Sequence, residues 1–275
     1  MFERFERSFR LIGESFSLLK KDKELLLFPV VSAFVSLIAI VAFVIPLILS
    51  IGFGAFGQRS FWFMVFILYF LIYFISVFFT AGIIGAADIR LRGGDPKFSD
   101  GIKIAAKNVH RLFLWALIAG TVGILIRALR GRRRNIIGSI ISFILKAAWE
   151  ILTFFVIPVI ILEKKGIRDS AKRSLELFRK AWGEEIIGQF SIGAIFAVAA
   201  LLGFIPLLLA FFSGSMTLTI IVLIVLVFYW VSLMILSSTL NGIYKAALYN
   251  YAAGNKVKFS DEFLRNAFVQ KKKKK

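Results

Sequence analysis

Residues 61–87 read FWFMVFILYFLIYFISVFFTAGIIGAA, a stretch without a single charged side chain. At 1.5 Å per residue a helix of this length is about 40 Å long, more than the roughly 30 Å of hydrocarbon in a bilayer. The apolar residues follow one another without the polar–apolar alternation of a transmembrane β-strand. The segment therefore predicts a membrane-spanning helix.

Five further apolar runs flank this one and are also long enough to cross a bilayer. The chain has 275 residues, of which 59% are hydrophobic, whereas soluble domains average about 45–50%. We therefore predict an all-α fold, a polytopic transmembrane helix bundle that forms a single integral membrane domain over residues 1–275. The six predicted spans are 25–53, 61–87, 112–129, 136–162, 186–212 and 218–244.

Basic residues predict the orientation of the spans. The formal net charge is +19, and 28 of the 35 Lys and Arg residues fall in the two ends and the loops after spans two and four. In a six-span path these segments share one side, so both termini are predicted to be cytoplasmic. The group Arg127, Arg130, Arg132, Arg133 and Arg134 is the exception to this rule. Because the charges flank membrane spans, they indicate contact with anionic lipid headgroups, and no nucleic-acid partner is expected.

Two short motifs occur twice at nearly the same spacing. The sequence IPLIL at 45–49 recurs as IPLLL at 205–209, and KFSD at 97–100 recurs at 258–261. Both copies have the same predicted orientation, so they form a parallel internal repeat and not the inverted repeat of many transporters.

The repeat divides the predicted domain into four parts. Repeat one covers 1–101, an insert with spans three and four covers 102–166, repeat two covers 167–270, and a polybasic tail covers 271–275.

The KFSD motif has a structural explanation. Ser99 and Ser260 are predicted to be N-caps, with Asp100 and Asp261 in the following first turn. Gly93-Gly94 and Gly254 are predicted to supply the preceding turns.

Amphipathic helices are predicted between the spans, each with an apolar stripe opposite basic residues. Such a stripe either lies on lipid headgroups or packs under the bundle, and the two are compatible. The four stripes are Phe2, Phe5, Phe9, Ile12, Phe16 and Leu19; Phe98, Ile102, Ala105, Val109 and Leu112; Ile167, Ala171, Leu175, Phe178 and Trp182; and Phe259, Phe263 and Ala267.

Span four carries two charges of opposite sign. Lys146 and Glu150 are four residues apart, hence on one helical face. A charge without a partner costs free energy inside the bilayer. One hypothesis is an intramembrane polar site for an ion, a proton or a headgroup; the other is a structural pair, with Gln189 or Asn241 as further partners. Asp88, Arg90, Asn108, His110 and Lys245 lie near predicted cytoplasmic ends, where snorkelling explains them.

Three prolines fall inside predicted spans. Pro46, Pro158 and Pro206 each remove one helical hydrogen bond, so kinks are predicted there. In membrane proteins such kinks can line a binding site, but they also occur as shape alone.

The sequence contains few residues for enzyme chemistry. The chain has no cysteine and one histidine, His110, so a histidine or cysteine metal site is not expected. No phosphate-binding or dinucleotide-binding glycine loop occurs. We expect no catalytic residues, no metal, no cofactor and no enzyme activity.

Several segments together carry a family resemblance. They are AWE at 148–150, TFFVIPV at 153–159, Glu163, SA at 170–171, RS at 173–174, LF at 177–178, Lys180, WGE at 182–184, WALI at 115–118 and DKELLLFP at 22–29. These segments resemble an uncharacterised domain-of-unknown-function family of bacterial and archaeal six-helix membrane proteins. The resemblance implies a similar fold, a location in the cell membrane of a prokaryote, and no known activity. A looser resemblance extends to the membrane region of some glycerophosphodiester phosphodiesterases, without their catalytic domain.

Two functions are compatible with these observations. The first is a non-enzymatic, multi-pass membrane protein that associates with anionic lipid and has a scaffold or lipid-organising role. The alternative is a transporter or channel for a small solute, an ion or a lipid that uses Lys146 and Glu150.

Overall fold

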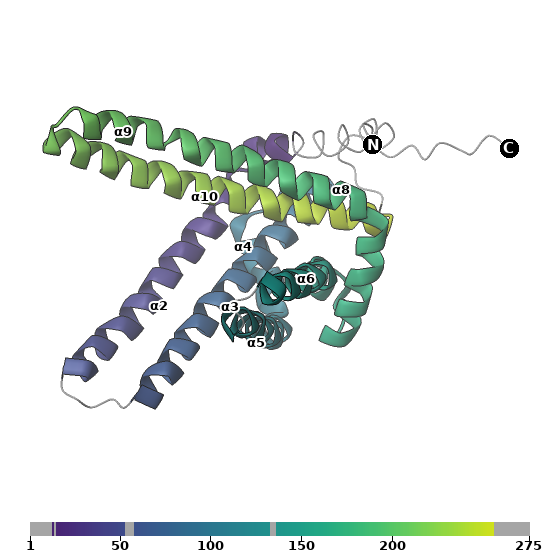
Figure 1. The fold of residues 1–275 in the computed structure, drawn as a ribbon. Helices are drawn as coiled ribbons and strands as arrows, with labels where there is room; N and C mark the ends of the chain where they lie inside the picture. The colour runs from purple at the N-terminus through teal and green to yellow at the C-terminus, as the bar shows by residue number, and fades with distance from the viewer. Residues whose placement is uncertain (1–12, 14, 53–57, 133–135, 256–275) are drawn as a thin grey trace. The chain divides into compact units, whose positions relative to one another are not determined.

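All regular elements of the described residues are helices (Figure 1). The structure is a computed structural model, and it describes residues 13, 15–52, 58–132 and 136–255. The elements are η1 Lys23–Leu26, α2 Leu27–Gly52, α3 Gln58–Leu91, α4 Phe98–Lys107, α5 Val109–Arg132, α6 Ile136–Thr153, α7 Val156–Pro158, the π-helical η2 Val159–Glu163, α8 Ile167–Leu202, α9 Phe204–Phe212 and α10 Met216–Ala253.

Six helical stretches are long and apolar enough to cross a membrane, which confirms the predicted fold class and number of spans. The last one is 38 residues long and continues past the predicted end at residue 244, because its final turns are buried in protein: Leu248, Tyr249 and Asn250 are at most 3% exposed. The six stretches are Lys23–Ile48, Ser60–Leu91, Val109–Ala128, Ile140–Glu163, Ile192–Phe212 and Met216–Ala253.

The chain divides into two compact units. The central unit comprises residues 27–86 and 96–180, and the terminal unit comprises 1–26, 87–95 and 181–275. Each unit is described by itself below. The predicted division into repeat, insert and repeat stays a prediction, and the second KFSD motif lies outside the described residues.

Phe28 is the centre of close packing in the central unit. Its side chain is fully buried, and its ring centroid lies 4.6 Å from that of Phe98. A Cβ atom added to Gly82 would lie 2.6 Å from Cε1 of Phe28, and one added to Gly101 would lie 2.4 Å from Cζ. Glycine at these two positions therefore allows α3 and α4 to approach the same aromatic ring, as small residues do in many membrane-helix interfaces.

Aromatic contacts join further helices of this unit. Trp115 of α5 and Trp149 of α6 are stacked, with centroids 5.9 Å apart and an interplanar angle of 14°. Phe113 of α5 meets Phe70 and Phe74 of α3 edge-on, at 5.1 and 5.5 Å. These geometries are the favoured ones for aromatic pairs.

In the terminal unit α9 and α10 are joined by a short turn and lie side by side (Figure 1). The turn has Gly214 at a φ of 69°, and Ser215 is the N-cap of α10, accepting the Leu218 N–H at 3.3 Å. The other end of α10 is closed by Gly254, whose φ is 74°. Gly93, before α4, also has a positive φ of 87°. The turns predicted at these last two glycines are confirmed.

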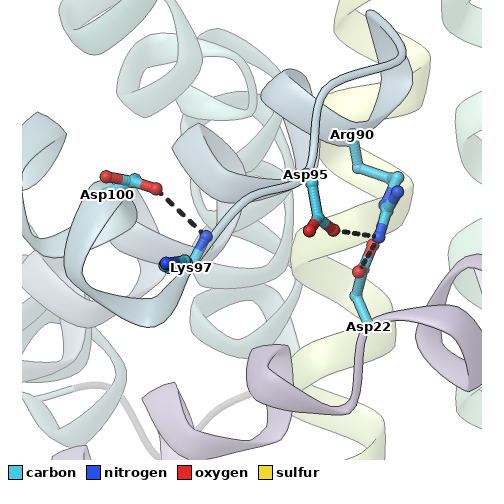
Figure 2. A network of polar contacts seen from close by, with 5 residues as sticks. All are labelled: Asp22, Arg90, Asp95, Lys97 and Asp100. Carbon is cyan, nitrogen blue, oxygen red and sulfur yellow. Dashed lines mark hydrogen bonds and ion pairs between the residues drawn. The ribbon is translucent and has the colours of Figure 1, made fainter.

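The predicted N-cap at Ser99 is wrong. Helix α4 begins at Phe98 with Lys97 as its N-cap, and the Asp100 carboxylate accepts the Lys97 backbone N–H at 3.1 Å (Figure 2). A carboxylate at the third helical position reaches back in this way, so the helix starts two residues earlier than predicted. This backbone hydrogen bond lowers the pKa of Asp100, and Lys103 at 3.5 Å contributes.

The predicted stripes pack unevenly in the described helices. On α4 the buried residues are Gly101 and Ala105. The same stripe continues into α5, where Leu112 is buried and Val109 is exposed. On the first turns of α8 the most buried side chains are Ser170, Ser174 and Leu177. Small residues thus provide much of the packed face. Residues 2–12 and the stripe beginning at Phe259 lie outside the described residues.

Gly101→Ala is expected to destabilise the protein by about 1–3 kcal/mol, because its Cβ would overlap Phe28 and lie 2.6 Å from the Gly82 carbonyl oxygen. Thermal unfolding in detergent measures this loss. The control is Gly193→Ala, whose Cβ meets nothing within 4 Å. Equal stability of the two variants would contradict the close packing.

The lowered pKa of Asp100 predicts a pH dependence. The stabilisation is fully present above the ordinary carboxyl value of 3.8 and is lost as the pH falls through the lower folded-state pKa. Asp100→Asn should therefore unfold at a lower temperature than the parent chain at pH 6. The two melting temperatures should converge in acid, and a pH-independent difference would exclude the carboxylate as the cause.

Candidate functional site

Lys146 and Glu150 form an ion pair on α6. The Nζ–Oε1 distance is 3.6 Å, and the side chains are 67% and 65% exposed. The candidate span begins at Ile140, so Lys146 lies about 9 Å along it, a depth from which lysine can snorkel toward headgroups.

Asn241 belongs to the terminal unit, and its described hydrogen bonds stay within α10. Its amide nitrogen donates to the Ser237 carbonyl oxygen at 2.9 Å and approaches Ser237 Oγ at 3.4 Å. The Gln189 side chain lies outside the described residues. The hypothesis that these amides complete the site of Lys146 and Glu150 stays a hypothesis.

The helix containing Pro158 is interrupted before the proline. Helix α6 ends at Thr153, and α7 begins at Val156. Proline clashes with the carbonyl four residues before it, here that of Phe154, so the break falls where this constraint acts. The Phe155 N–H donates instead to Ser174 Oγ at 3.0 Å, and both residues are fully buried.

A similar interruption precedes Pro206. Helix α8 ends at Leu202, and α9 begins at Phe204. Two side chains of α10 donate to backbone carbonyls just before this break: Tyr229 OH to Ala199 O at 2.7 Å and Trp230 Nε1 to Ala200 O at 3.2 Å. Around Pro46, in contrast, α2 continues to Gly52.

A charged cluster in the terminal unit was not predicted from the sequence. Arg90 donates from Nε and Nη2 to the two carboxylate oxygens of Asp22, and from Nη2 to Asp95 Oδ1 at 2.8 Å (Figure 2). The Asp22 side chain is 6% exposed, whereas that of Asp95 is 87% exposed. Of the two ion pairs that Arg90 makes, the bidentate pair with Asp22 is therefore the one removed from solvent.

A second group of polar side chains is hydrogen-bonded around Asp88. Its carboxylate accepts from Arg92 Nε at 2.8 Å and from the fully buried Asn250 Nδ2 at 2.7 Å. Asn255 Nδ2 then donates to Asn250 Oδ1 at 2.9 Å. The hydrogen bond to Asp88 raises the pKa of Arg92. The buried Asp88 carboxylate is thus bonded to Asn250, a residue 162 positions away in the sequence.

These charges stabilise the fold because each has a partner of opposite sign or a hydrogen bond. Snorkelling, the sequence-based explanation of Asp88 and Arg90, missed this pairing. A usable signal was the alternation of charges in DIRLRGGD at 88–95, directly after an uncharged span. Among the described residues no group of three or more His, Cys, Asp or Glu side chains is placed to hold a metal ion.

Basic side chains lie on the two short amphipathic segments of the central unit, α4 and the first turns of α8. Two of the basic residues are paired: Lys103 lies 3.5 Å from Asp100, and Arg173 lies 3.0 Å from Glu176 and 3.2 Å from Glu163, hydrogen bonds that raise the pKa of Arg173. Others make no ion pair with any side chain that the structure describes. These exposed residues are Lys107, Arg168, Lys172, Arg179 and Lys180.

Asp22→Asn should destabilise the protein by about 1.5–3 kcal/mol, because the amide cannot replace the bidentate charge-assisted bonds to Arg90. Asp95→Asn is the matched control, since it removes an exposed partner of the same arginine and should cost less than about 1 kcal/mol. Chemical unfolding in detergent compares the two. Equal losses would show that burial of Asp22 is not what makes its pair strong.

Comparison with known proteins identifies the family of this chain. Residues 60–259 match the model of a family of unknown function (DUF6159), a segment that includes five of the six candidate spans and both Asp88 and Asn250. A comparison with curated proteins finds no match. The resemblance to glycerophosphodiester phosphodiesterases stays a prediction. The chain thus belongs to the family of unknown function DUF6159, as its resemblance to an uncharacterised membrane family predicted.

Proposed function

We propose that this protein is a non-enzymatic, multi-pass membrane protein that binds anionic lipid headgroups. The observation that carries the proposal is the set of exposed basic side chains on α4 and the first turns of α8 that have no acidic partner among the described residues. A phosphate group is the natural partner of such cations, at about 1 kcal/mol per residue near an anionic surface.

The packing of these helices supports the proposal. Gly101 and Ala105 bury one face of α4, and Ser170, Ser174 and Leu177 bury one face of α8. The cations on the remaining faces therefore come from helices held in place by protein contacts. The backbone that carries them is therefore already ordered before a lipid binds.

The expected partners follow from the predicted topology. Both segments lie on the predicted cytoplasmic side, where positive residues accumulate. Anionic phospholipids of the inner leaflet of a prokaryotic cell membrane are the proposed partners, with no cofactor and no nucleic acid. A scaffold or lipid-organising role fits a membrane protein that gathers such lipids.

Transport through Lys146 and Glu150 has less support. The side chains of the pair are 67% and 65% exposed, and the pair is explained by an ion pair between neighbouring turns of α6. A conducting site needs a water-accessible path beside the charges. We therefore keep the transporter or channel as the second hypothesis only.

Thermal unfolding in detergent micelles tests the lipid proposal. Phosphatidylglycerol should raise the melting temperature more than phosphatidylcholine does, and the difference should shrink as salt rises from low to about 0.5 M because of screening. Changing Lys107, Lys172 and Lys180 together to Gln should remove most of the difference.

The matched control changes the same three lysines to Arg, which keeps the charge and should keep the response to phosphatidylglycerol. Equal stabilisation by the two lipids, or a Gln variant that responds like the parent chain, would reject the proposal.

A further inference from the structure

A group of arginines near the end of α5 is not explained by the proposed function. The sequence has no aspartate or glutamate from residue 25 to 87 or from residue 101 to 149. The first three spans, and span four before Glu150, therefore contain no carboxylate that could balance the arginine charges. The five arginines of the group are Arg127, Arg130, Arg132, Arg133 and Arg134.

Arg127 lies at the opposite end of a membrane span from the cations of α4. Helix α4 leads through Asn108 into α5, whose candidate span is Val109–Ala128. At 1.5 Å per residue, Val109 and Arg127 are about 27 Å apart along this helix, close to the thickness of the hydrocarbon. Lys107 and Arg127 therefore lie near opposite surfaces of the membrane.

The Arg127 guanidinium is held over an aromatic ring. Its Cζ atom lies 5.9 Å from the centroid of the Tyr69 ring, which is within the range of a cation–π interaction. Tyr69 in turn stacks on Tyr73, with centroids 6.3 Å apart and an interplanar angle of 16°. Because the tyrosines belong to α3 and the arginine to α5, this contact joins two helices of the central unit.

Two glycines of α5 lie against the same tyrosines. A Cβ atom added to Gly120 would lie 3.7 Å from Cδ1 of Tyr73. One added to Gly123 would lie 3.6 Å from the hydroxyl oxygen of Tyr69. Gly120, Gly123 and Arg127 are spaced by three and four positions, hence on one face of α5. The face that carries Arg127 is therefore the face that packs on the two tyrosines, which restricts where the arginine side chain lies.

Arg127 nevertheless remains accessible to a ligand. The residue is exposed, and no aspartate or glutamate among the described residues pairs with it. A cation at the edge of the hydrocarbon without a counter-ion in the protein favours an anion from outside the chain, and arginine matches the geometry of phosphate. The exposed side of α5 that leads up to it is apolar, with Leu117 40% and Leu125 57% exposed. An apolar surface next to the cation suits the acyl chain of a lipid and not a free ion.

We propose that Arg127 binds the phosphate group of an anionic phospholipid in the leaflet opposite to the cations of α4. The ring of Tyr69 positions the guanidinium, and an acyl chain of the lipid lies along the exposed apolar side of α5. In the predicted topology this is the outer leaflet. The site shares no residue with the basic side chains of α4 and α8, so it goes beyond the proposed function and does not rest on it.

A fluorescent label beside Arg127 tests the site, because the chain has no cysteine of its own. Ala128→Cys, at an exposed position, is labelled with bimane, and the full chain is reconstituted in phosphatidylcholine nanodiscs. Phosphatidylglycerol or phosphatidylcholine with bromine atoms near the head group is then added in rising fractions. Since bromine quenches the label at short range only, the two curves give the preference for phosphatidylglycerol at this site.

Two pairs of variants separate the charge from its position. Arg127→Gln should lower the preference about three- to fivefold, the effect of one cation near the surface, whereas Arg127→Lys should keep most of it. Tyr69→Leu leaves every charge in place and should lower the preference about twofold, because the guanidinium loses its ring. Tyr69→Phe keeps the ring and should behave like the parent chain.

Two controls define where the lipid binds and what it is. A label at Leu117→Cys lies about three turns earlier on the same side of α5, roughly 16 Å away, and its quenching should not respond to Arg127→Gln. Inorganic phosphate at constant ionic strength should leave the preference at Ala128→Cys unchanged.

An unchanged preference in Arg127→Gln would overturn the site. Equal losses in Tyr69→Leu and Tyr69→Phe would overturn the role of the ring. A preference that disappears when inorganic phosphate is added would overturn the assignment to a lipid, since a free anion would then occupy the site. Changing Lys107, Lys172 and Lys180 to Gln should alter none of these results, so this test and that of the proposed function can fail separately.

Discussion

Backbone polar groups in hydrocarbon have no water to bond, so a helix that breaks inside a membrane needs a new partner for each group that the break releases. Both interruptions that precede a proline have such partners in this protein. Ser174 Oγ accepts the Phe155 N–H, and Trp230 donates to the Ala200 carbonyl. Tyr229 adds a second hydrogen bond to the Ala199 carbonyl, which also accepts the Gly203 N–H. The positions of these side chains therefore decide where spans four and five can bend.

The same requirement explains how polar side chains are distributed. Asp22 is paired with Arg90, and Asp88 accepts from Arg92 and from Asn250. In the described part of the chain the one buried side-chain nitrogen or oxygen atom without a hydrogen-bond partner is Asn241 Oδ1.

The spans could be predicted from the sequence because the length of an apolar run is a local property. The start of α4 differs from the prediction by two residues, since the carboxylate of Asp100 competes with the Ser99 hydroxyl as a capping group. The bond between Asp88 and Asn250 could not be predicted, because its partners are 162 positions apart and meet only when the helices pack. The exposure of the Lys146–Glu150 pair likewise depends on how α6 is rotated against its neighbours, which spacing alone does not determine.

The length of α10 has a mechanical consequence. Its 38 residues make a rod of about 57 Å, nearly twice the thickness of the hydrocarbon. The part after Thr239 is enclosed by protein and held through Asn250 to Asp88, while the part before it is largely uncovered. A rod held at one end cannot slide along the membrane normal, so a thinner or thicker bilayer has to be accommodated by tilt of its free part.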